Sequence, residues 1–234
     1  MQKFDCVFVN GDSYSATGKT ELVYGDFLAR KFSVPNLNFS ATGSSNQRII
    51  RSSIEYLQKV KTEFQNPLVI IGWSFIRRLE VWYYGSDQTI LSRVPDIDSM
   101  PDSRLITLNL LLNSGAATVE QKCLVNEDLF VHKQLTDFYT NLYMFANFLQ
   151  SQNLSYLFFS AARNTDCPVH CFPYVNSLEQ VKWVVSNKNI YRLHDFCVMD
   201  WAKENDPNAD PVTGHLSQSG HEKFSNFILD NMLG

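Results

Sequence analysis

Residues 4–15 read FDCVFVNGDSYS, and this stretch decides the fold. From Phe4 to Asn10 the chain is a short run of mainly apolar and β-branched residues, and Gly11-Asp12-Ser13 follows at once. Such a run is typical of a buried parallel strand that opens into a loop. Ligands of open parallel α/β sheets bind beyond the carboxyl ends of the strands. The loop after this strand is therefore the first place to look for a functional site.

The rest of the chain alternates between expected strands and expected helices. Strands are expected at 37–39, 68–71 and 156–159, and helices at 19–32, from 44 or 45 to 66, at 135–149 and from 217 to 232. The helical segments carry apolar residues three and four positions apart, whereas the strands are short apolar runs. This alternation predicts an α/β protein, a three-layer α/β/α sandwich with a mainly parallel, flavodoxin-like sheet.

One segment breaks the alternation. Residues 83–130 mix Pro, Asp, Ser and Gly with an apolar patch at 105–112, and they fit no regular period. We interpret them as an insertion that serves as a lid or an interaction loop. The remaining sequence shows no shift in composition, and 234 residues are within the range of one hydrophobic core. A single domain spanning 1–234 is therefore expected.

Composition argues against several classes of partner. The formal net charge is −4, and Lys and Arg are scattered rather than clustered, so nucleic acid is not an expected partner. The first residues lack the apolar segment of a signal peptide, and no apolar run approaches the ~18 residues of a membrane-spanning helix. The sequence thus predicts a cytoplasmic protein without a membrane span. It leaves the oligomeric state open.

The cysteines indicate neither disulfides nor a metal. There are five, an odd number at irregular spacing, which favours free and mostly buried thiols: Cys6, Cys123, Cys167, Cys171 and Cys197. Together with His170 and His194, the last three could suggest zinc, but their spacing matches no common zinc site. No metal and no organic cofactor is expected.

Four loops gather residues suited to nucleophilic catalysis. Besides the loop at Ser13, they are 43–46 (GSSN), 72–74 (GWS) and 214–221 (GHLSQSGH), and the last precedes the final helix. A serine hydroxyl attacks only when a nearby base takes its proton, and the resulting oxyanion needs N–H donors. His215 could be that base. Gly43 could bring a backbone N–H close to substrate, and Asn46 offers a side-chain amide at a helix start.

Two of these motifs resemble those of a known family. Gly11-Asp12-Ser13 is similar to the first block of the SGNH/GDSL hydrolases, and the run from His215 to His221 resembles their last block. The resemblance implies an esterase, lipase or carbohydrate deacetylase, acting on a small-molecule or carbohydrate acyl ester. It implies Ser13 as the nucleophile, His215 as the base, and the N–H groups of Ser13 and Gly43 as oxyanion donors.

The sequence departs from the family pattern at two places. The third block, Gly-x-Asn-Asp in the family, reads GWSF at 72–75, so either Asn46 or Ser74 is expected to replace the oxyanion asparagine. The family's aspartate stands three residues before the histidine, where this chain has Val212, and the nearest acid is Asp210. We expect Asp210 to complete the triad if the loop bulges; otherwise a main-chain carbonyl must orient the imidazole.

Three further residues are candidates for substrate binding because of their place after the expected strands. They are Asp12, Trp73 and Arg77. For Trp73 packing is the alternative role, and for Arg77 a surface ion pair.

Other interpretations compete with the hydrolase. Ser13 could only cap a helical turn, Asn46 could be only a helix cap, and His221 is expected to be structural. The chain could be a non-catalytic binding protein that uses 83–130 as its contact surface. Gly18-Lys19-Thr20 resembles the end of a phosphate-binding loop, but that motif requires glycine where this chain has Ser13.

Overall fold

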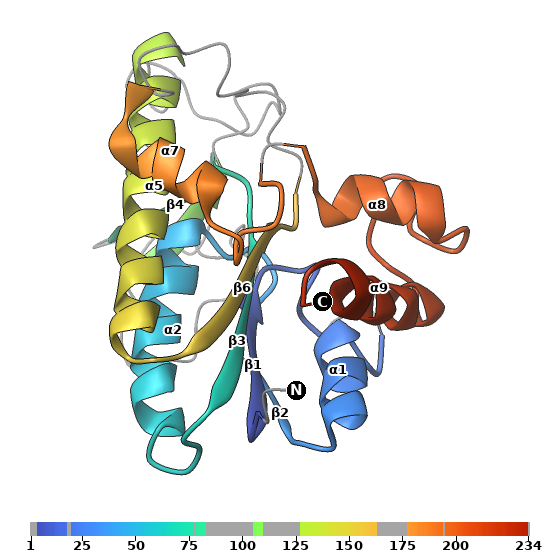
Figure 1. Ribbon diagram of the computed structural model, residues 1–234. Coiled ribbons are helices and arrows are strands. Elements are labelled where there is room, and N and C mark those ends of the chain that lie inside the picture. Colours follow the sequence, from blue (N-terminus) through green and yellow to red (C-terminus); the bar gives the residue numbers. More distant parts are fainter. Residues whose placement is uncertain are drawn as a thin grey trace.

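A computed structural model describes residues 4–17, 20–76, 78–82, 105–109, 127–162, 177–193 and 195–233 (Figure 1). In chain order the helices and strands are β1 (Cys6–Gly11), α1 (Tyr24–Phe32), β2 (Asn36–Asn38), α2 (Asn46–Val60), β3 (Pro67–Trp73), β4 (Arg78–Trp82), β5 (Leu105–Asn109), α5 (Glu127–Ser151), β6 (Ser155–Ser160), α7 (Glu179–Ser186), α8 (Val198–Asn205) and α9 (Gln218–Asn231).

The central sheet has four parallel strands in the order β2-β1-β3-β6. The predicted first strand is its centre, because β1 pairs with β2 on one edge and along its whole length with β3 on the other. Strands added on opposite sides of β1 create the point where strand order reverses, and ligands of such sheets bind there. Ser13, two residues beyond the end of β1, lies at that point.

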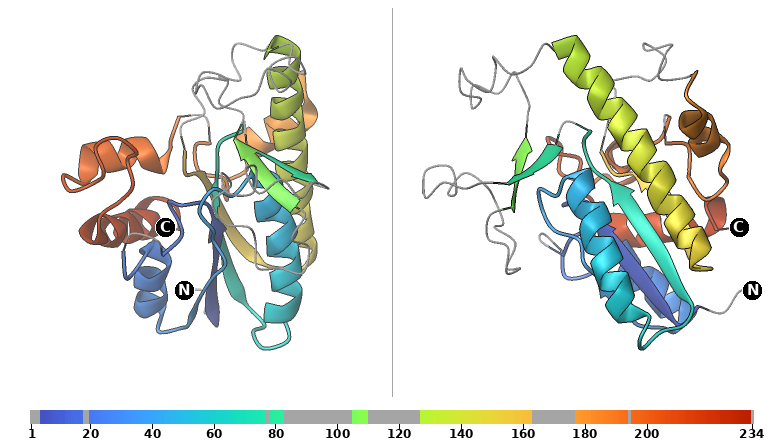
Figure 2. Two further views of the ribbon diagram at one scale, coloured as in Figure 1. Left: turned by 180° about the vertical axis from the view of Figure 1, so that it is seen from behind. Right: turned by 90° about the vertical axis from the view of Figure 1, so that its left-hand side faces the viewer.

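Helices cover both faces of this sheet, as Figures 1 and 2 show. α1 and α9 lie on one face, and α2 and α5 lie on the other. Successive side chains of a strand point to opposite faces, so Val7 and Val9 pack toward α1 and α9, whereas Cys6 and Phe8 pack toward α2 and α5. The structure confirms the predicted three-layer α/β/α sandwich.

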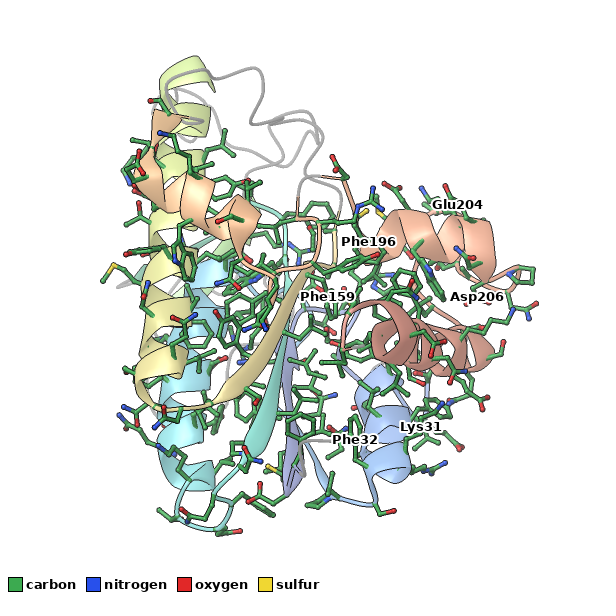
Figure 3. The ribbon with its side chains drawn as sticks, viewed as in Figure 1. Lys31, Phe32, Phe159, Phe196, Glu204 and Asp206 are labelled. Carbon is green, nitrogen blue, oxygen red and sulfur yellow. The ribbon has the colours of Figure 1, made fainter. Side chains whose placement is uncertain are left out.

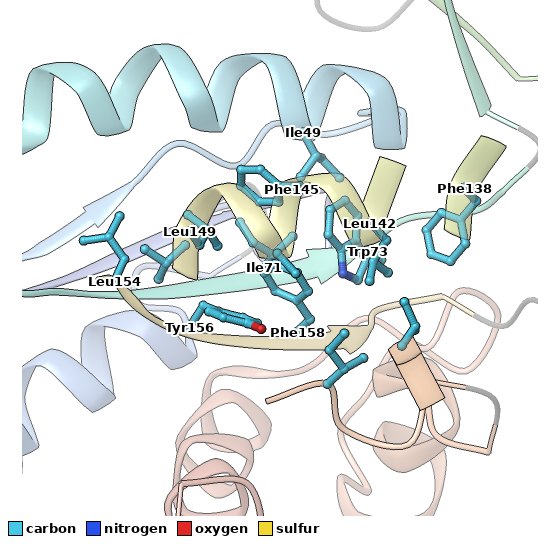
Figure 4. Close-up of a cluster of buried hydrophobic side chains, with 14 of the residues drawn as sticks. Ile49, Ile71, Trp73, Phe138, Leu142, Phe145, Leu149, Leu154, Tyr156 and Phe158 are labelled. Atoms are coloured by element: carbon cyan, nitrogen blue, oxygen red, sulfur yellow. The ribbon is translucent and has the colours of Figure 1, made fainter. Parts of the chain in front are cut away.

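Trp73 lies in the core on the α2 and α5 face, and Figure 4 shows it among the rings of that cluster. β3 runs two residues further than expected, so Trp73 is still in the strand and shares a face with Val69 and Ile71. Its indole is fully buried and makes edge-to-face contacts with Phe138, Phe145 and Phe158. Trp73 therefore packs the core, the alternative role that the sequence left open, and no part of its ring reaches solvent.

The structure moves some boundaries and adds elements that the sequence did not predict. α1 begins at Tyr24 rather than at residue 19. At this start Asp26 Oδ2 accepts the Val23 N–H at 2.8 Å. Of the two serines expected to cap α2, Ser45 accepts the Arg48 N–H. The predicted insertion contains β5, which pairs antiparallel with β4, and the first residues of α5. Its other residues, 83–104 and 110–126, lie outside the described residues.

The described residues contain neither a membrane-spanning helix nor a metal-binding cluster. No helix among them is both long and apolar enough to cross a bilayer. They also contain no group of three or more His, Cys, Asp or Glu side chains arranged to hold a metal ion. Cys6 and Cys197 are buried thiols, while Cys123, Cys167 and Cys171 lie outside the part of the chain that is described.

Candidate active site

Ser13 and His215 meet at the carboxyl end of β1. His215 Nε2 lies 2.8 Å from Ser13 Oγ, although 202 positions separate the two residues. Both side chains are half-buried. This distance is within hydrogen-bond reach, the geometry that a general base requires toward the proton it removes. The structure thus brings together the two residues that the sequence singled out.

A tight turn holds Ser13 where β1 ends. The N–H groups of Ser15 and Ala16 both donate to Asp12 O, at 2.9 and 3.1 Å, so the chain folds back directly after the strand. Ser15 Oγ then lies against Gly11 and Gly72, where an added Cβ would approach it to 2.6 and 2.8 Å. Only glycine leaves this space at the two strand ends. The turn is not part of a helix, since α1 begins at Tyr24.

Asp206 holds the segment that carries His215. This carboxylate is buried and accepts the Ser217 N–H at 2.7 Å and the Ser217 hydroxyl at 2.9 Å. Ser217 in turn caps α9 by accepting the Gly220 N–H. Figure 3 shows Asp206 between the end of α8 and α9. The sequence pattern did not reveal Asp206. A glycine in the first turn of a helix, at position 220, is the feature of the sequence that hints at a close neighbour there. An added Cβ would lie 1.9 Å from Asp206 Oδ2.

The imidazole of His215 has two further neighbours that the sequence pattern did not single out. Its Nδ1 lies 2.6 Å from Thr213 Oγ1. The ring of Tyr14 stacks on it, with centroids 4.4 Å apart and planes inclined by 5°. The phenol of Tyr14 donates to Thr213 O. Burial, and next the nearby Asp12 carboxylate, raise the pKa of Tyr14 well above its usual range, so the phenol stays protonated as a donor.

Asp210, the expected acid of the triad, lies in the same loop and shapes it. Its Oδ1 accepts the N–H groups of Val212 and Thr213 at 3.0 and 2.9 Å. Its backbone forms two hydrogen bonds with the far end of the loop: the Asp210 N–H donates to His215 O, and the Gly214 N–H donates to Asp210 O. Asp210 thereby closes the loop that presents Thr213 and His215.

Asp12, the predicted substrate contact, is fully buried beneath the turn. Its Oδ1 accepts the Tyr14 N–H at 3.1 Å, and its Oδ2 accepts the Ser74 hydroxyl at 2.7 Å and Arg78 Nη1 at 3.1 Å. A buried carboxylate is tolerated when it is paired and hydrogen-bonded in this way. Asp12 therefore joins the Ser13 turn to β4 and to the end of β3.

Asn46 and Ser74, the two expected substitutes for the oxyanion asparagine, bond to each other. Asn46 Oδ1 accepts the Ser74 N–H at 2.8 Å, and Asn46 Nδ2 donates to Ser74 O at 3.2 Å. The Ser74 hydroxyl is buried between Asp12 and Arg78. These contacts join the second and third loops and use one of the two Nδ2 hydrogens of Asn46. Gly43, whose φ of 81° suits glycine, is a further oxyanion candidate outside the Ser13 turn.

Arg78 is the cation of this network and directly follows Arg77 in the sequence. Its Nη1 donates to the Ser74 hydroxyl at 2.7 Å and to Ser44 O at 3.4 Å, in addition to Asp12. It thus contacts all three loops that follow β1, β2 and β3. Arg77, the predicted substrate contact, lies outside the described residues, as do Gly18 and Lys19 of the phosphate-loop alternative and His170 and His194 of the zinc alternative.

His221 is buried, as expected for a structural histidine. It lies near Tyr24, with ring centroids 6.2 Å apart. Burial lowers its pKa to about 4, although the neighbouring carboxylates of Asp206 and Asp26 oppose the shift. The ring is therefore neutral at pH 7.

A groove of about 820 Å³ borders His215 and leads between the start of α1 and the start of α9. Leu22, Phe27 and Leu216 contribute apolar side chains to its wall. Its size suits a small ligand, since such sites measure roughly 300–1,000 Å³. Three carboxylate residues line it, Glu21, Asp210 and Glu222, and the described part of the lining includes no Lys or Arg.

Fold and site together define an α/β/α sandwich with a Ser-His pair at the switch point of its parallel sheet. Residues 15–181 match the family described as "Family of unknown function (DUF6071)", and the chain belongs to this family. None of the curated proteins matches the chain.

Solved structures of low sequence identity are similar to this chain over nearly its whole length. One is described as a putative GDSL-like lipase from Parabacteroides merdae, with a TM-score of 0.45 and 13% identity over 98% of this chain and 96% of that one. Another is the lipase/acylhydrolase from Enterococcus faecalis, with a TM-score of 0.43 and 14% identity over 96% and 93% of the two chains. A protein from Lactobacillus plantarum has a TM-score of 0.42 and 15% identity over 99% of both. At these identities no activity is transferred to this chain.

Proposed function

We propose that this protein is a serine hydrolase that cleaves small acyl esters, with Ser13 as the nucleophile and His215 as the general base. The observation that carries the proposal is the 2.8 Å contact between His215 Nε2 and Ser13 Oγ. An imidazole at this distance can take the hydroxyl proton as the oxygen attacks a carbonyl carbon. The resemblance of the first and last sequence motifs to the SGNH/GDSL hydrolases supports the same assignment.

The reaction would proceed through an acyl-enzyme. His215 Nε2 takes the proton of Ser13, whose oxygen attacks the ester carbon, and the imidazolium then gives that proton to the departing alcohol. In the second half, His215 takes a proton from water, the resulting hydroxide attacks the acyl carbon, and Ser13 leaves with the proton that His215 returns.

The tetrahedral oxyanion requires donors, and we assign the backbone N–H groups of Ser13 and Gly43. Among the described residues, neither N–H donates a hydrogen bond. Free backbone donors beside a nucleophile are what an oxyanion hole needs. Asp210 supports the base by holding the loop that carries it, through the N–H groups of Val212 and Thr213.

The groove beside His215, whose described lining includes the base but not Ser13, suggests the class of substrate. Its volume of about 820 Å³ and its apolar residues suit a small ester. The three carboxylates in its wall would repel an anionic group. We therefore expect neutral esters, such as short acyl esters or acylated sugars, to be better substrates than esters that carry a carboxylate or phosphate.

Turnover of p-nitrophenyl acetate tests the proposal. The wild type should release p-nitrophenol in repeated turnovers, and Ser13→Ala should reduce the rate to that of the buffer. A matched control is Ser219→Ala, which removes an exposed serine hydroxyl from the first turn of α9. Equal rates for wild type and Ser13→Ala would contradict the proposal and favour a binding protein built on a hydrolase fold.

A further inference from the structure

Two neutral side chains contact the imidazole of His215 at its second nitrogen and on one face of the ring. Thr213 Oγ1 lies in hydrogen-bond contact with Nδ1 at 2.6 Å. The Tyr14 ring covers one face, nearly parallel at 5° and with its centroid 4.4 Å from that of the imidazole. The Nε2 atom is left directed toward Ser13.

Both neighbours favour the charged ring that the proposed reaction creates. When His215 takes the serine proton, its Nδ1–H needs an acceptor, and the Thr213 hydroxyl oxygen can accept it. The face of an aromatic ring attracts a cation, so the Tyr14 ring stabilises an imidazolium stacked on it. Neither contact adds a charge of its own.

We infer that Thr213 and Tyr14 form an imidazole clamp that positions His215 and stabilises its protonated form. This inference rests on the proposed function and extends it to the second nitrogen and the face of the base. Thr213 and Tyr14 are positioning residues, because they act on the substrate only through His215.

The clamp is itself held by hydrogen bonds from buried or loop-closing groups. Asp210 Oδ1 accepts the Thr213 N–H at 2.9 Å, and the Tyr14 phenol donates to Thr213 O. The Tyr14 N–H donates to the buried Asp12 carboxylate at 3.1 Å. The backbone N–H groups of both residues are held by carboxylates, so Thr213→Val can remove the contact with His215 and keep these bonds. Loss of the Tyr14 phenol also removes its bond to Thr213 O, a loss that Tyr14→Phe and Tyr14→Leu share, so only the difference between these two variants reports on the ring.

Matched substitutions separate this role from folding. Thr213→Val keeps the shape of the side chain and removes the hydroxyl, whereas Thr213→Ser keeps the hydroxyl. Tyr14→Leu removes the ring, whereas Tyr14→Phe keeps it. Val212→Ala is the control on the same loop, since the Val212 side chain is 84% exposed. For each variant we would measure the rate of fluorophosphonate labelling of Ser13, kcat and KM for p-nitrophenyl acetate, and the melting temperature.

The clamp predicts that Thr213→Val labels roughly tenfold or more slowly than wild type, and Tyr14→Leu roughly tenfold or more slowly than Tyr14→Phe, because a hydrogen bond to a charged group and a ring contact with a cation are lost. The loss should appear in kcat and leave KM unchanged. Thr213→Ser and Val212→Ala should stay near the wild-type rate. Labelling of Thr213→Val at the wild-type rate would overturn the inference.

The nitrogen-15 resonance of His215 Nδ1 tests the clamp without any activity. Loss of the hydrogen bond in Thr213→Val should shift this resonance, and Val212→Ala should not. If the wild type is never labelled, the proposed function fails, and this spectrum alone decides the clamp. An unchanged Nδ1 resonance in Thr213→Val would show that Thr213 does not bond His215 and would overturn it.

Discussion

Arg78 Nη1 lies 3.1 Å from Asp12 Oδ2, in an ion pair whose carboxylate is fully buried and whose guanidinium is 13% exposed. The pair joins β4 to the turn that carries Ser13. The same guanidinium reaches the Ser74 hydroxyl and Ser44 O, so one side chain fixes the three loops around the proposed oxyanion hole. Its removal should therefore affect both stability and the geometry of Ser13.

Substitution of Arg78 by methionine should destabilise the fold by about 3 kcal/mol, because it leaves a buried charge without its partner. Chemical denaturation of the wild type, Arg78→Met, Asp12→Asn and the double variant gives the coupling between the two residues. The double variant should lose less than the sum of the single losses, by about 1 kcal/mol or more.

The exposed pair of Lys59 and Glu55 provides the control, with side chains 66% and 41% exposed. Lys59→Met should cost no more than about 0.5 kcal/mol, since an exposed i,i+4 pair contributes little. Similar losses for Arg78→Met and Lys59→Met would show that the buried pair stabilises the fold no more than an exposed one.

Gly220→Ala should destabilise the protein even though alanine is the better helix former. In the first turn of α9 the gain in helix propensity is about 1 kcal/mol at most. The new Cβ would lie 1.9 Å from Asp206 Oδ2, and the carboxylate would have to leave Ser217. We expect a net loss of about 2 kcal/mol or more, since overpacking and loss of a buried hydrogen bond act together.

Glu222 is exposed in the same helix, so Glu222→Ala should leave the melting temperature close to that of the wild type. If Gly220→Ala were as stable as Glu222→Ala, the contact between Asp206 and Ser217 would not be what holds the segment of His215.

The buried His221 should make the protein less stable in acid. Its pKa is lowered from 6.5 to about 4 in the folded state, so the unfolded chain binds the proton more tightly. This stability is fully present above pH 6.5 and is lost as the pH falls toward 4, by roughly 3 kcal/mol in total. Unfolding measured from pH 4 to pH 7 in wild type and His221→Gln should show a shallower pH dependence in the variant.

Carboxylates also titrate in this range, so the difference between the two proteins is the relevant quantity. Parallel stability curves for wild type and His221→Gln would show that burial does not perturb the pKa of His221 in this way.

The sequence predicted the sheet and the Ser-His pair because both depend on local patterns. The strand at Phe8 is a continuous apolar run that ends in Gly-Asp-Ser, and the segment of His215 directly precedes a helix with a regular apolar face. The carboxyl end of a parallel strand places the loop of Ser13 at the ligand-binding edge of the sheet. His215 lies between α8 and α9 rather than after a strand, and the sequence pairs it with Ser13 through the resemblance of its segment to the last SGNH/GDSL block.

Other features depend on contacts that no local pattern reveals. The apolar run at 68–71 stops two residues before the end of β3, and alternation along the full strand buries Trp73 beside Ile71. Asp206 bonds Ser217, eleven positions away, and only the space left by Gly220 hints at it. α7 and α8 are short, with two buried residues each, so their apolar periodicity is too weak to predict.

Labelling of Ser13 by a fluorophosphonate, with the modified peptide identified by mass spectrometry, tests the Ser-His assignment most directly. We predict one adduct, on Ser13, that is absent in Ser13→Ala and forms roughly a hundredfold more slowly in His215→Gln, because the base is lost. A folded wild-type protein without an adduct on Ser13, or one labelled equally fast in His215→Gln, would contradict the assignment.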